Sequence, residues 1–183
     1  MKEKSPKTLL RWLGVLLASH FVANLLFSLI FFRIIVQMWE DYPDTGNRTL
    51  FFFGAAIYLI IAIFNARVES SSYEYQDGLH EAMKQPGFSL IGYYKRNLLK
   101  NKLEPIVLSA LLQLPLVISY ALIGLKLDEL TKLERFYIMN AGAYAMTHNP
   151  ILGLLLNILV FAALLILTSF IALVSAKRDW EQY

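Results

Sequence analysis

The length of its apolar blocks is the feature that most constrains this chain. Four blocks, at residues 12–36, 50–66, 105–125 and 151–176, consist largely of apolar side chains. About 20 such residues in a helix cross the roughly 30 Å hydrocarbon core of a bilayer. A helix also satisfies its own backbone hydrogen bonds there. The sequence therefore predicts an all-α integral membrane protein, a single bundle of four transmembrane helices over residues 1–183.

Composition supports this class and excludes others. The chain is 57% hydrophobic and 17% charged, whereas soluble domains are about 45–50% apolar and about 25% charged. It has no cysteine, so disulfides and thiolate metal sites are excluded. The net charge of +3 lies beside the apolar blocks, which predicts contact with the bilayer and its anionic headgroups and not with nucleic acid.

The distribution of Lys and Arg predicts the orientation. Twelve of these side chains fall in the N-terminal segment, in residues 67–104 and after residue 176, whereas four fall in the loops on the other side. Cytoplasmic loops carry the excess of positive charge. We therefore expect both termini in the cytoplasm and the protein in the plasma or cell membrane. The first apolar block is longer than the apolar core of a signal peptide, so we interpret it as an uncleaved span.

The cytoplasmic loop, residues 67–104, is expected to form two amphipathic interfacial helices. Ser71 and Glu74 have capping-box spacing at the start of the first helix, and Pro86-Gly87 ends it. The second helix, over residues 89–103, carries four basic residues that are expected to contact lipid or a partner: Lys95, Arg96, Lys100 and Lys102. Three interpretations stay open: the helix lies among headgroups, docks a partner, or packs beneath the bundle.

The loops on the outer side carry two further predictions. Residues 42–47 are typical of a turn, and Asn47 begins a glycosylation sequon. The longer loop, residues 126–150, is expected to hold another interfacial helix. Residues 136–150 have few charges and either lie in the interface or re-enter the membrane, in which case protein must cover their backbone.

A few polar residues fall inside the predicted spans. His20 and Asn24 share one helix face, and Gln113 is expected at a similar depth, two residues before a proline that should bend its helix. These three residues form either a substrate or proton path or interhelical hydrogen bonds, worth about 0.6 to 2 kcal/mol each. No Asp or Glu lies inside a predicted span, which favours the second interpretation.

Motifs for catalysis are missing from the sequence. It contains no HExxH, no G-x-S-x-G and no glycine-rich phosphate loop, so we assign no catalytic residue, no metal site and no cofactor. The leading hypothesis is a non-enzymatic subunit or accessory protein of a larger membrane complex of the transport type. The alternative is a small homo-oligomeric transporter or channel with a polar path at His20, Asn24 and Gln113. A membrane-embedded enzyme is the third hypothesis.

Overall fold

The part of the chain that the structure describes is predominantly helical. This computed structural model describes residues 41–123 and 138–181, together with Val22, Ile34 and Gln37. No strand occurs among these residues. The predicted first span, residues 12–36, lies outside them except for Val22 and Ile34, so a four-span bundle stays a prediction.

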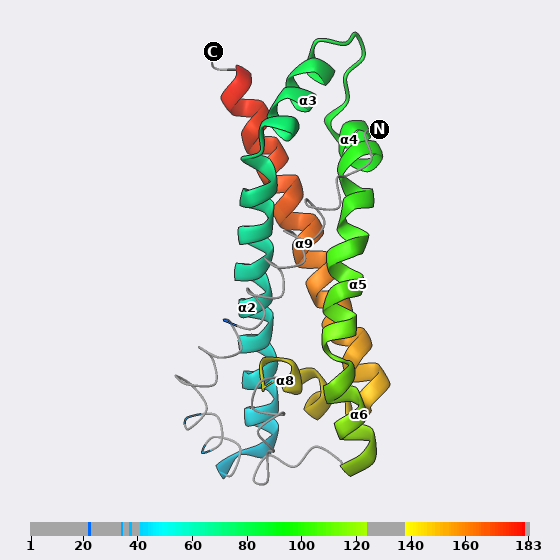
Figure 1. Ribbon diagram of the computed structural model, residues 1–183. Helices are drawn as coiled ribbons and strands as arrows, with labels where there is room; N and C mark the ends of the chain where they lie inside the picture. Colours follow the sequence, from blue (N-terminus) through cyan, green and yellow to red (C-terminus); the bar gives the residue numbers. More distant parts are fainter. Residues whose placement is uncertain (1–21, 23–33, 35–36, 38–40, 124–137, 182–183) are drawn as a thin grey trace.

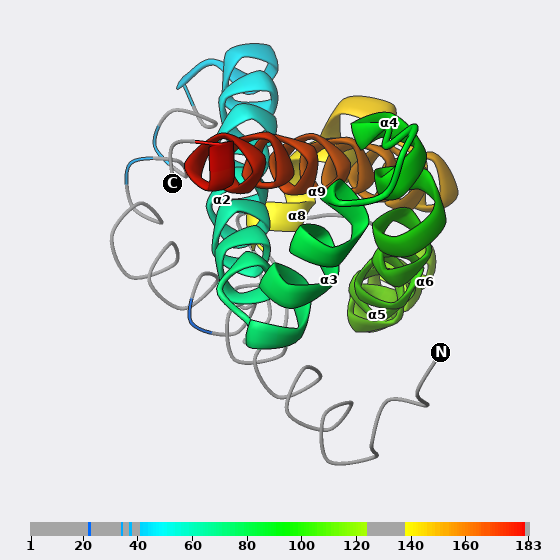
Figure 2. The same ribbon diagram turned by 90° about the horizontal axis from the view of Figure 1, so that it is seen from above.

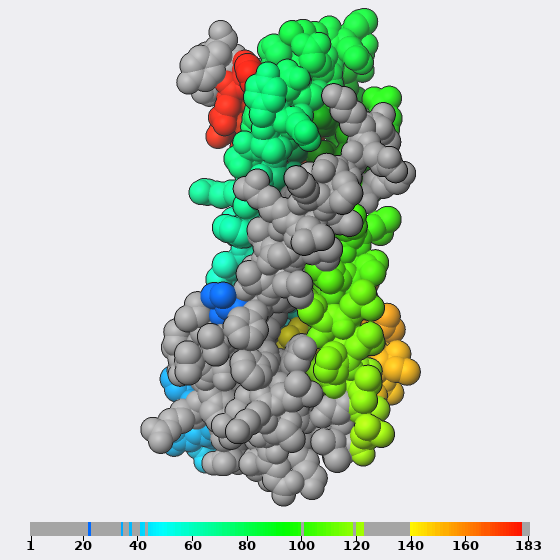
Figure 3. All heavy atoms as spheres, in the orientation of Figure 1, coloured from blue at the N-terminus to red at the C-terminus, as the bar shows by residue number. Residues whose placement is uncertain are grey.

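Within the described residues, two helices are long and apolar enough to cross a membrane. Helix α2 covers Pro43–Ser70 and helix α9 covers Pro150–Glu181. They cross one another along the length of the molecule, and α5 and α6 run beside α9 on its other side (Figures 1 and 2). In Figure 3 the side chains of α5 and α6 form one edge of the molecule. These two spans match the predicted blocks 50–66 and 151–176, although α2 extends further at both ends.

The N-terminal extension of α2 corrects the prediction of a turn over residues 42–47. The helix already begins at Pro43, with Asp44 in its first turn. Proline is favoured at the first helical position, and an acidic side chain there is stabilised by the helix dipole. Asn47 of the sequon is therefore a buried helical residue, which a glycosylated asparagine in a surface loop would not be.

Three successive serines end α2. The hydroxyls of Ser70, Ser71 and Ser72 donate to the carbonyls of residues 67, 68 and 69, at 3.2, 3.2 and 2.9 Å. These carbonyls belong to the last turn, whose oxygens lack partners within a helix. Ser72 also accepts from the amide of Tyr75 at 3.3 Å and so caps helix α3, Tyr73–Met83. The cap is thus one residue later than the predicted Ser71.

The second half of the loop at residues 67–104 is helical, but the type of helix changes along it. Helix α4 (Leu90–Tyr93) is followed by the π-helix η1 (Tyr94–Leu98), by the 3-10 helix η2 (Leu99–Lys102) and by α5 (Leu103–Leu112). The predicted helix over residues 89–103 therefore exists as a continuous path into the next apolar segment. π-Helical turns are rare and often occur at functional sites.

The third apolar segment is broken at Gln113. Helix α5 ends at Leu112, and helix α6 (Leu114–Ile123) follows at an angle of 40°. Pro115 has no amide hydrogen for the carbonyl four residues earlier, and its ring disfavours a helical conformation of the preceding residue. The Gln113 amide instead donates to the carbonyl of Ala110 at 3.1 Å. The predicted bend is confirmed, and it lies two residues before the proline.

Helix α8 (Ile138–Thr147) is a short buried helix that packs against α2 and α9 at the end opposite α3 (Figure 1). A Cβ atom on Gly142 would lie 2.3 Å from the Phe51 backbone nitrogen, so the backbones of α8 and α2 touch here. His148 then takes a left-handed conformation, with φ of 49°. Asn149 caps α9 by accepting from the amides of Ile151 and Leu152 at 2.9 and 3.1 Å. Residues 140–145 are therefore covered by protein, whereas Met146, His148 and Asn149 are exposed.

Two hydrophobic clusters hold these helices together. One lies where α2, α8 and α9 meet, around Tyr58 and Phe161. The other lies at the α3 end and joins α3, α4 and η1 to α9, around Leu79 and Leu173. Each cluster is adjacent to one group of buried polar side chains.

Candidate functional site

The first polar group is the α8 network, which consists of Tyr58, Gln113, Asn140, Tyr144 and Asn157. All five side chains are buried, and they come from α2, the α5–α6 break, α8 and α9. Spacing places Asn140 and Tyr144 on one face of α8, because residues four apart are neighbours on a helix. Tyr144 packs against Gly153 of α9, where a Cβ atom would lie 2.6 Å from its ring.

Hydrogen bonds close this network on itself. The Asn157 side-chain amide donates to Gln113 Oε1 at 2.9 Å and to the Asn140 carbonyl at 3.0 Å. The Tyr144 hydroxyl donates to the same Gln113 oxygen at 3.4 Å. Asn140 Nδ2 donates to the hydroxyl of Tyr58, and Gln113 Nε2 to the Ser109 carbonyl at 3.2 Å. Every side-chain amide of the network thus has a partner, as buried polar groups in a membrane require.

Of the predicted polar cluster, the structure places Gln113. His20 and Asn24 lie outside the described residues. Among the described residues Gln113 is instead joined to Asn140, Tyr144 and Asn157. The predicted cluster does not include Asn157, which reaches Gln113 because α9 crosses the bundle. The useful signal was the pair Asn140 and Tyr144, four apart in a segment without charge.

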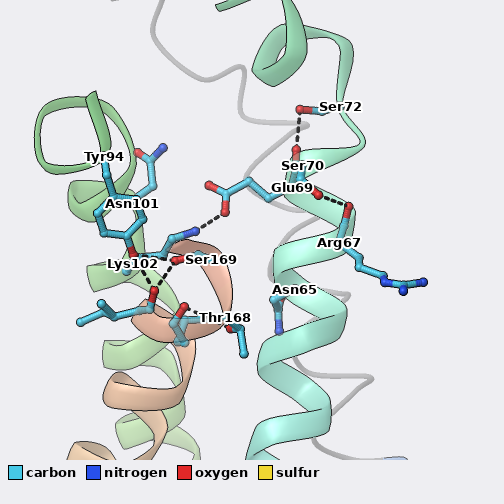
Figure 4. Close-up of polar contacts among 12 residues, drawn as sticks. Asn65, Arg67, Glu69, Ser70, Ser72, Tyr94, Asn101, Lys102, Thr168 and Ser169 are labelled. Carbon is cyan, nitrogen blue, oxygen red and sulfur yellow. Dashed lines mark hydrogen bonds and ion pairs between the residues drawn. The ribbon is translucent and has the colours of Figure 1, made fainter. Parts of the chain in front are cut away.

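The second polar group is an ion pair between Glu69 and Lys102 (Figure 4). Their side chains are 14% and 6% exposed. Glu69 lies in the last turn of α2 and Lys102 at the end of η2. Each charge is out of water, which is tolerated only because the other compensates it. This pair joins the end of α2 to the start of the bent segment α5–α6.

A small cavity adjoins the ion pair. It has a volume of about 20 Å³, and Asn65, Asn101 and Glu104 are among its other lining residues. The buried Asn65 donates to the Ile61 carbonyl at 2.8 Å, whereas its oxygen has no hydrogen-bond partner among the described residues. The cavity is large enough for a single water molecule. It is too small for a larger ligand.

The four predicted basic residues divide between two environments. Lys95 and Arg96 on η1 are exposed. Lys102 is buried in its ion pair, because Glu69 offers its ammonium a partner inside the bundle, so it departs from the predicted contact with lipid or a partner. The side chain of Lys100 lies outside the described residues. No local sequence signal predicts the ion pair, because Glu69 falls in the predicted loop at residues 67–104.

Tyr94 fixes the opposite face of η1 to α9. Its hydroxyl donates to the Ile166 carbonyl at 2.9 Å and lies 2.6 Å from Ser169 Oγ (Figure 4). Its ring meets that of Phe170 edge-on at 5.4 Å. In neighbouring α3, burial raises the pKa of the Tyr75 hydroxyl, and Glu69 adds to the effect. The layer at this end is therefore a packed part of the bundle.

No group of three or more His, Asp or Glu side chains suited to a metal ion occurs in the described part of the chain. Comparisons with protein-family models, with curated proteins and with solved structures found no match.

Proposed function

We propose that the chain is a non-enzymatic subunit or accessory protein of a larger membrane complex of the transport type, located in the cell membrane. It contacts a partner protein or anionic headgroups through Lys95 and Arg96. The observation that carries this proposal is the two-sided η1 segment, with Tyr94 and Leu98 buried against the bundle and both cations exposed.

The way in which η1 holds these two cations favours binding of an anionic group. Arg96 Nε donates to the Gly92 carbonyl at 3.2 Å, which uses one of the five N–H donors of the guanidinium. The others remain for a carboxylate or a phosphate, which arginine binds with two parallel hydrogen bonds. Because Tyr94 anchors the same turn, little side-chain and backbone freedom has to be lost when a ligand binds.

The α8 network supports a structural role for the membrane part. Its amide donors are used by other members or by backbone carbonyls. A substrate site would need some of these groups to face a ligand. The network therefore stabilises the contacts between helices through hydrogen bonds, as the interhelical interpretation of Gln113 expects.

The proposed orientation has the α3 end in the cytoplasm. The exposed cations Lys84, Lys95, Arg96 and Arg178 all belong to the elements at that end. Such an excess of positive charge favours the cytoplasmic side. Labelling of single cysteines introduced at Ser89 and at His148 in intact cells tests this, since only the His148 position should react with an impermeant reagent.

Quantitative co-purification in mild detergent tests the proposed contact. We expect a partner or anionic lipid to be retained by the wild type and lost from the variant Lys95→Glu/Arg96→Glu. Lys84→Glu is the matched control, because Lys84 is an exposed cation at the same end whose ion-pair partner is Glu81. Equal retention by all three proteins, or a lone monomer without partner or anionic lipid, contradicts the proposal.

A second candidate is the small homo-oligomeric transporter or channel. The break of the bent segment at Gln113 favours it, because transporters often bind substrates at discontinuous helices. Its path would include His20, Asn24 and Gln113. Flux in liposomes tests it: replacement of all three by Leu should abolish transport, and unchanged flux excludes this path.

A further inference from the structure

A groove of about 510 Å³ runs between α2 and α9 and is separate from both polar groups. Its floor is formed by small side chains, chiefly Ala66, Ala172 and Ala176. Its edges carry exposed large apolar side chains, including Ile63 and Ile171. Small residues on two crossing helices usually bring the helices together. Here these small residues form the floor of an open groove along the surface.

The length of the groove corresponds to one leaflet of a bilayer. On α9 its lining begins at Leu167 and ends at Asp179. Twelve residues of helix rise about 18 Å, and half of a bilayer core is about 15 Å thick. On α2 the lining begins at Leu59, short of the opposite end of the helix. A membrane helix of a partner would extend past this point into the other leaflet, whereas a lipid chain would not.

The end of the groove nearest α3 carries one charge of each sign. Arg67 and Asp179 line it together with Ser70 and Gln76. Gln76 is already engaged, since it donates to the Ser70 carbonyl at 2.6 Å and accepts from the Trp180 indole at 2.9 Å. Arg67 and Asp179 are exposed, and neither side chain has an ion pair within the described part of the chain. Figure 4 shows Arg67 on the side of α2 away from Lys102.

We infer that this groove binds one phosphatidylethanolamine molecule from the leaflet on the α3 side. An acyl chain lies along the alanine floor, where it covers apolar surface. The phosphate is bound by Arg67, whose guanidinium forms charge-assisted hydrogen bonds with phosphate oxygens. The primary ammonium of the headgroup pairs with Asp179. This inference does not depend on Lys95 and Arg96, so it can hold or fail apart from the proposed function.

The floor is tested by native mass spectrometry of the full chain after delipidation and re-incubation with defined lipids. The wild type should retain one phosphatidylethanolamine. Ala172→Phe places a ring in the groove. It should reduce retention about tenfold, because the ring takes the place of the acyl chain on the apolar floor. Ala163→Phe is the control, because Ala163 is exposed on α9 and does not line the groove. Equal retention by the two variants, or equal loss from both, overturns the inference.

Two surface variants test the headgroup without altering the packing. Arg67→Gln should weaken binding of every phospholipid about tenfold, because it removes the charged phosphate donor. Asp179→Asn should remove the preference for phosphatidylethanolamine over phosphatidylglycerol. An unchanged preference overturns the assignment of the headgroup. A dimer that is present in the wild type and absent from Ala172→Phe shows that a second copy occupies the groove, which also overturns it.

Discussion

Asn157 donates a 2.9 Å hydrogen bond to Oε1 of Gln113, the residue at which the bent segment breaks. The bond joins a helix break to α9, which runs past it. Because Gln113 also accepts from Tyr144, its side-chain oxygen links α8 and α9 to the α5–α6 break. Loss of this oxygen should therefore weaken the contacts between several helices.

A double-mutant cycle measures this link. Gln113→Leu and Asn157→Leu should each lower the free energy of unfolding by about 1–2 kcal/mol, and their coupling energy should be about 0.6–1.7 kcal/mol. Reversible unfolding in mixed micelles is the measurement. Thr168→Val serves as the control, since the Thr168 hydroxyl donates to Leu164 of its own helix at 2.8 Å. Purely additive losses would show that the two amides act independently.

The Glu69–Lys102 pair predicts a reversal between single and double variants. Lys102→Met alone should cost about 3–5 kcal/mol, because it leaves a buried carboxylate without compensation. Glu69→Leu/Lys102→Met should recover most of that loss, since two apolar side chains need no partner. The same micelle assay reports both values. Lys84→Met, at the exposed pair with Glu81, should leave stability unchanged, and a double variant as unstable as the single one contradicts a compensated pair.

Gly142 predicts a steric effect of a single methyl group. Gly142→Ala forces α8 away from the backbone of α2 at Phe51 and should lower the free energy of unfolding by about 1–3 kcal/mol. Gly78→Ala is a matched control inside helix α3, where a Cβ would lie 3.4 Å from the Tyr93 hydroxyl. That change should instead raise stability by up to about 1 kcal/mol through helix propensity. Thermal unfolding of both variants decides, and equal signs contradict the prediction.

His148 predicts an unusual order of substitutions. Its φ of 49° is a left-handed conformation that glycine adopts freely and a β-branched residue does not. His148→Gly should be neutral or stabilising, whereas His148→Val should cost about 1–2 kcal/mol. If the imidazole itself mattered, both variants would lose stability equally, which a comparison of their unfolding midpoints would reveal.

Tyr75 predicts a loss of stability at alkaline pH. Its pKa is raised in the folded chain by burial and by Glu69, so the unfolded chain loses this proton first. The stabilisation of the folded chain that results from this raised pKa is therefore complete below a pH of about 10, the ordinary pKa of tyrosine. It declines above that pH. Tyr75→Phe should make the decline shallower and should be tolerated at neutral pH, because the Tyr75 hydroxyl has no hydrogen-bond partner among the described residues. Tyr73→Phe, which removes the hydroxyl of a residue 82% exposed, is the matched control.

Local sequence signals predicted the long helices well. Apolar length located α2 and α9, and Pro115 located the bend, because these features act within a few residues along the chain. The same signals misplaced the start of α2: the residues around Pro43 suit a turn and a helix start equally. The first span stays a prediction, since residues 12–36 lie almost wholly outside the described part.

The polar groups depend on how the helices cross, which residue spacing does not encode. The predicted cluster of His20, Asn24 and Gln113 does not include Asn157, although Asn157 donates to Gln113 in the structure. A charge count placed Lys102 on the cytoplasmic surface, although Glu69, 33 positions earlier, holds it inside. In both cases the deciding contact joins residues far apart in the sequence.

The position of α8 in the chain has a consequence for biogenesis. Ten residues of helix rise about 15 Å, too little to cross a bilayer core of roughly 30 Å unaided. The second wall of the space that α8 occupies is α9, which the ribosome makes only afterwards. The bonds of Asn140 to Tyr58 and of Tyr144 to Gln113 join segments that are made before α9, whereas the two bonds that Asn157 donates can form only after it. The α8 network is thus complete only once α9 is in place.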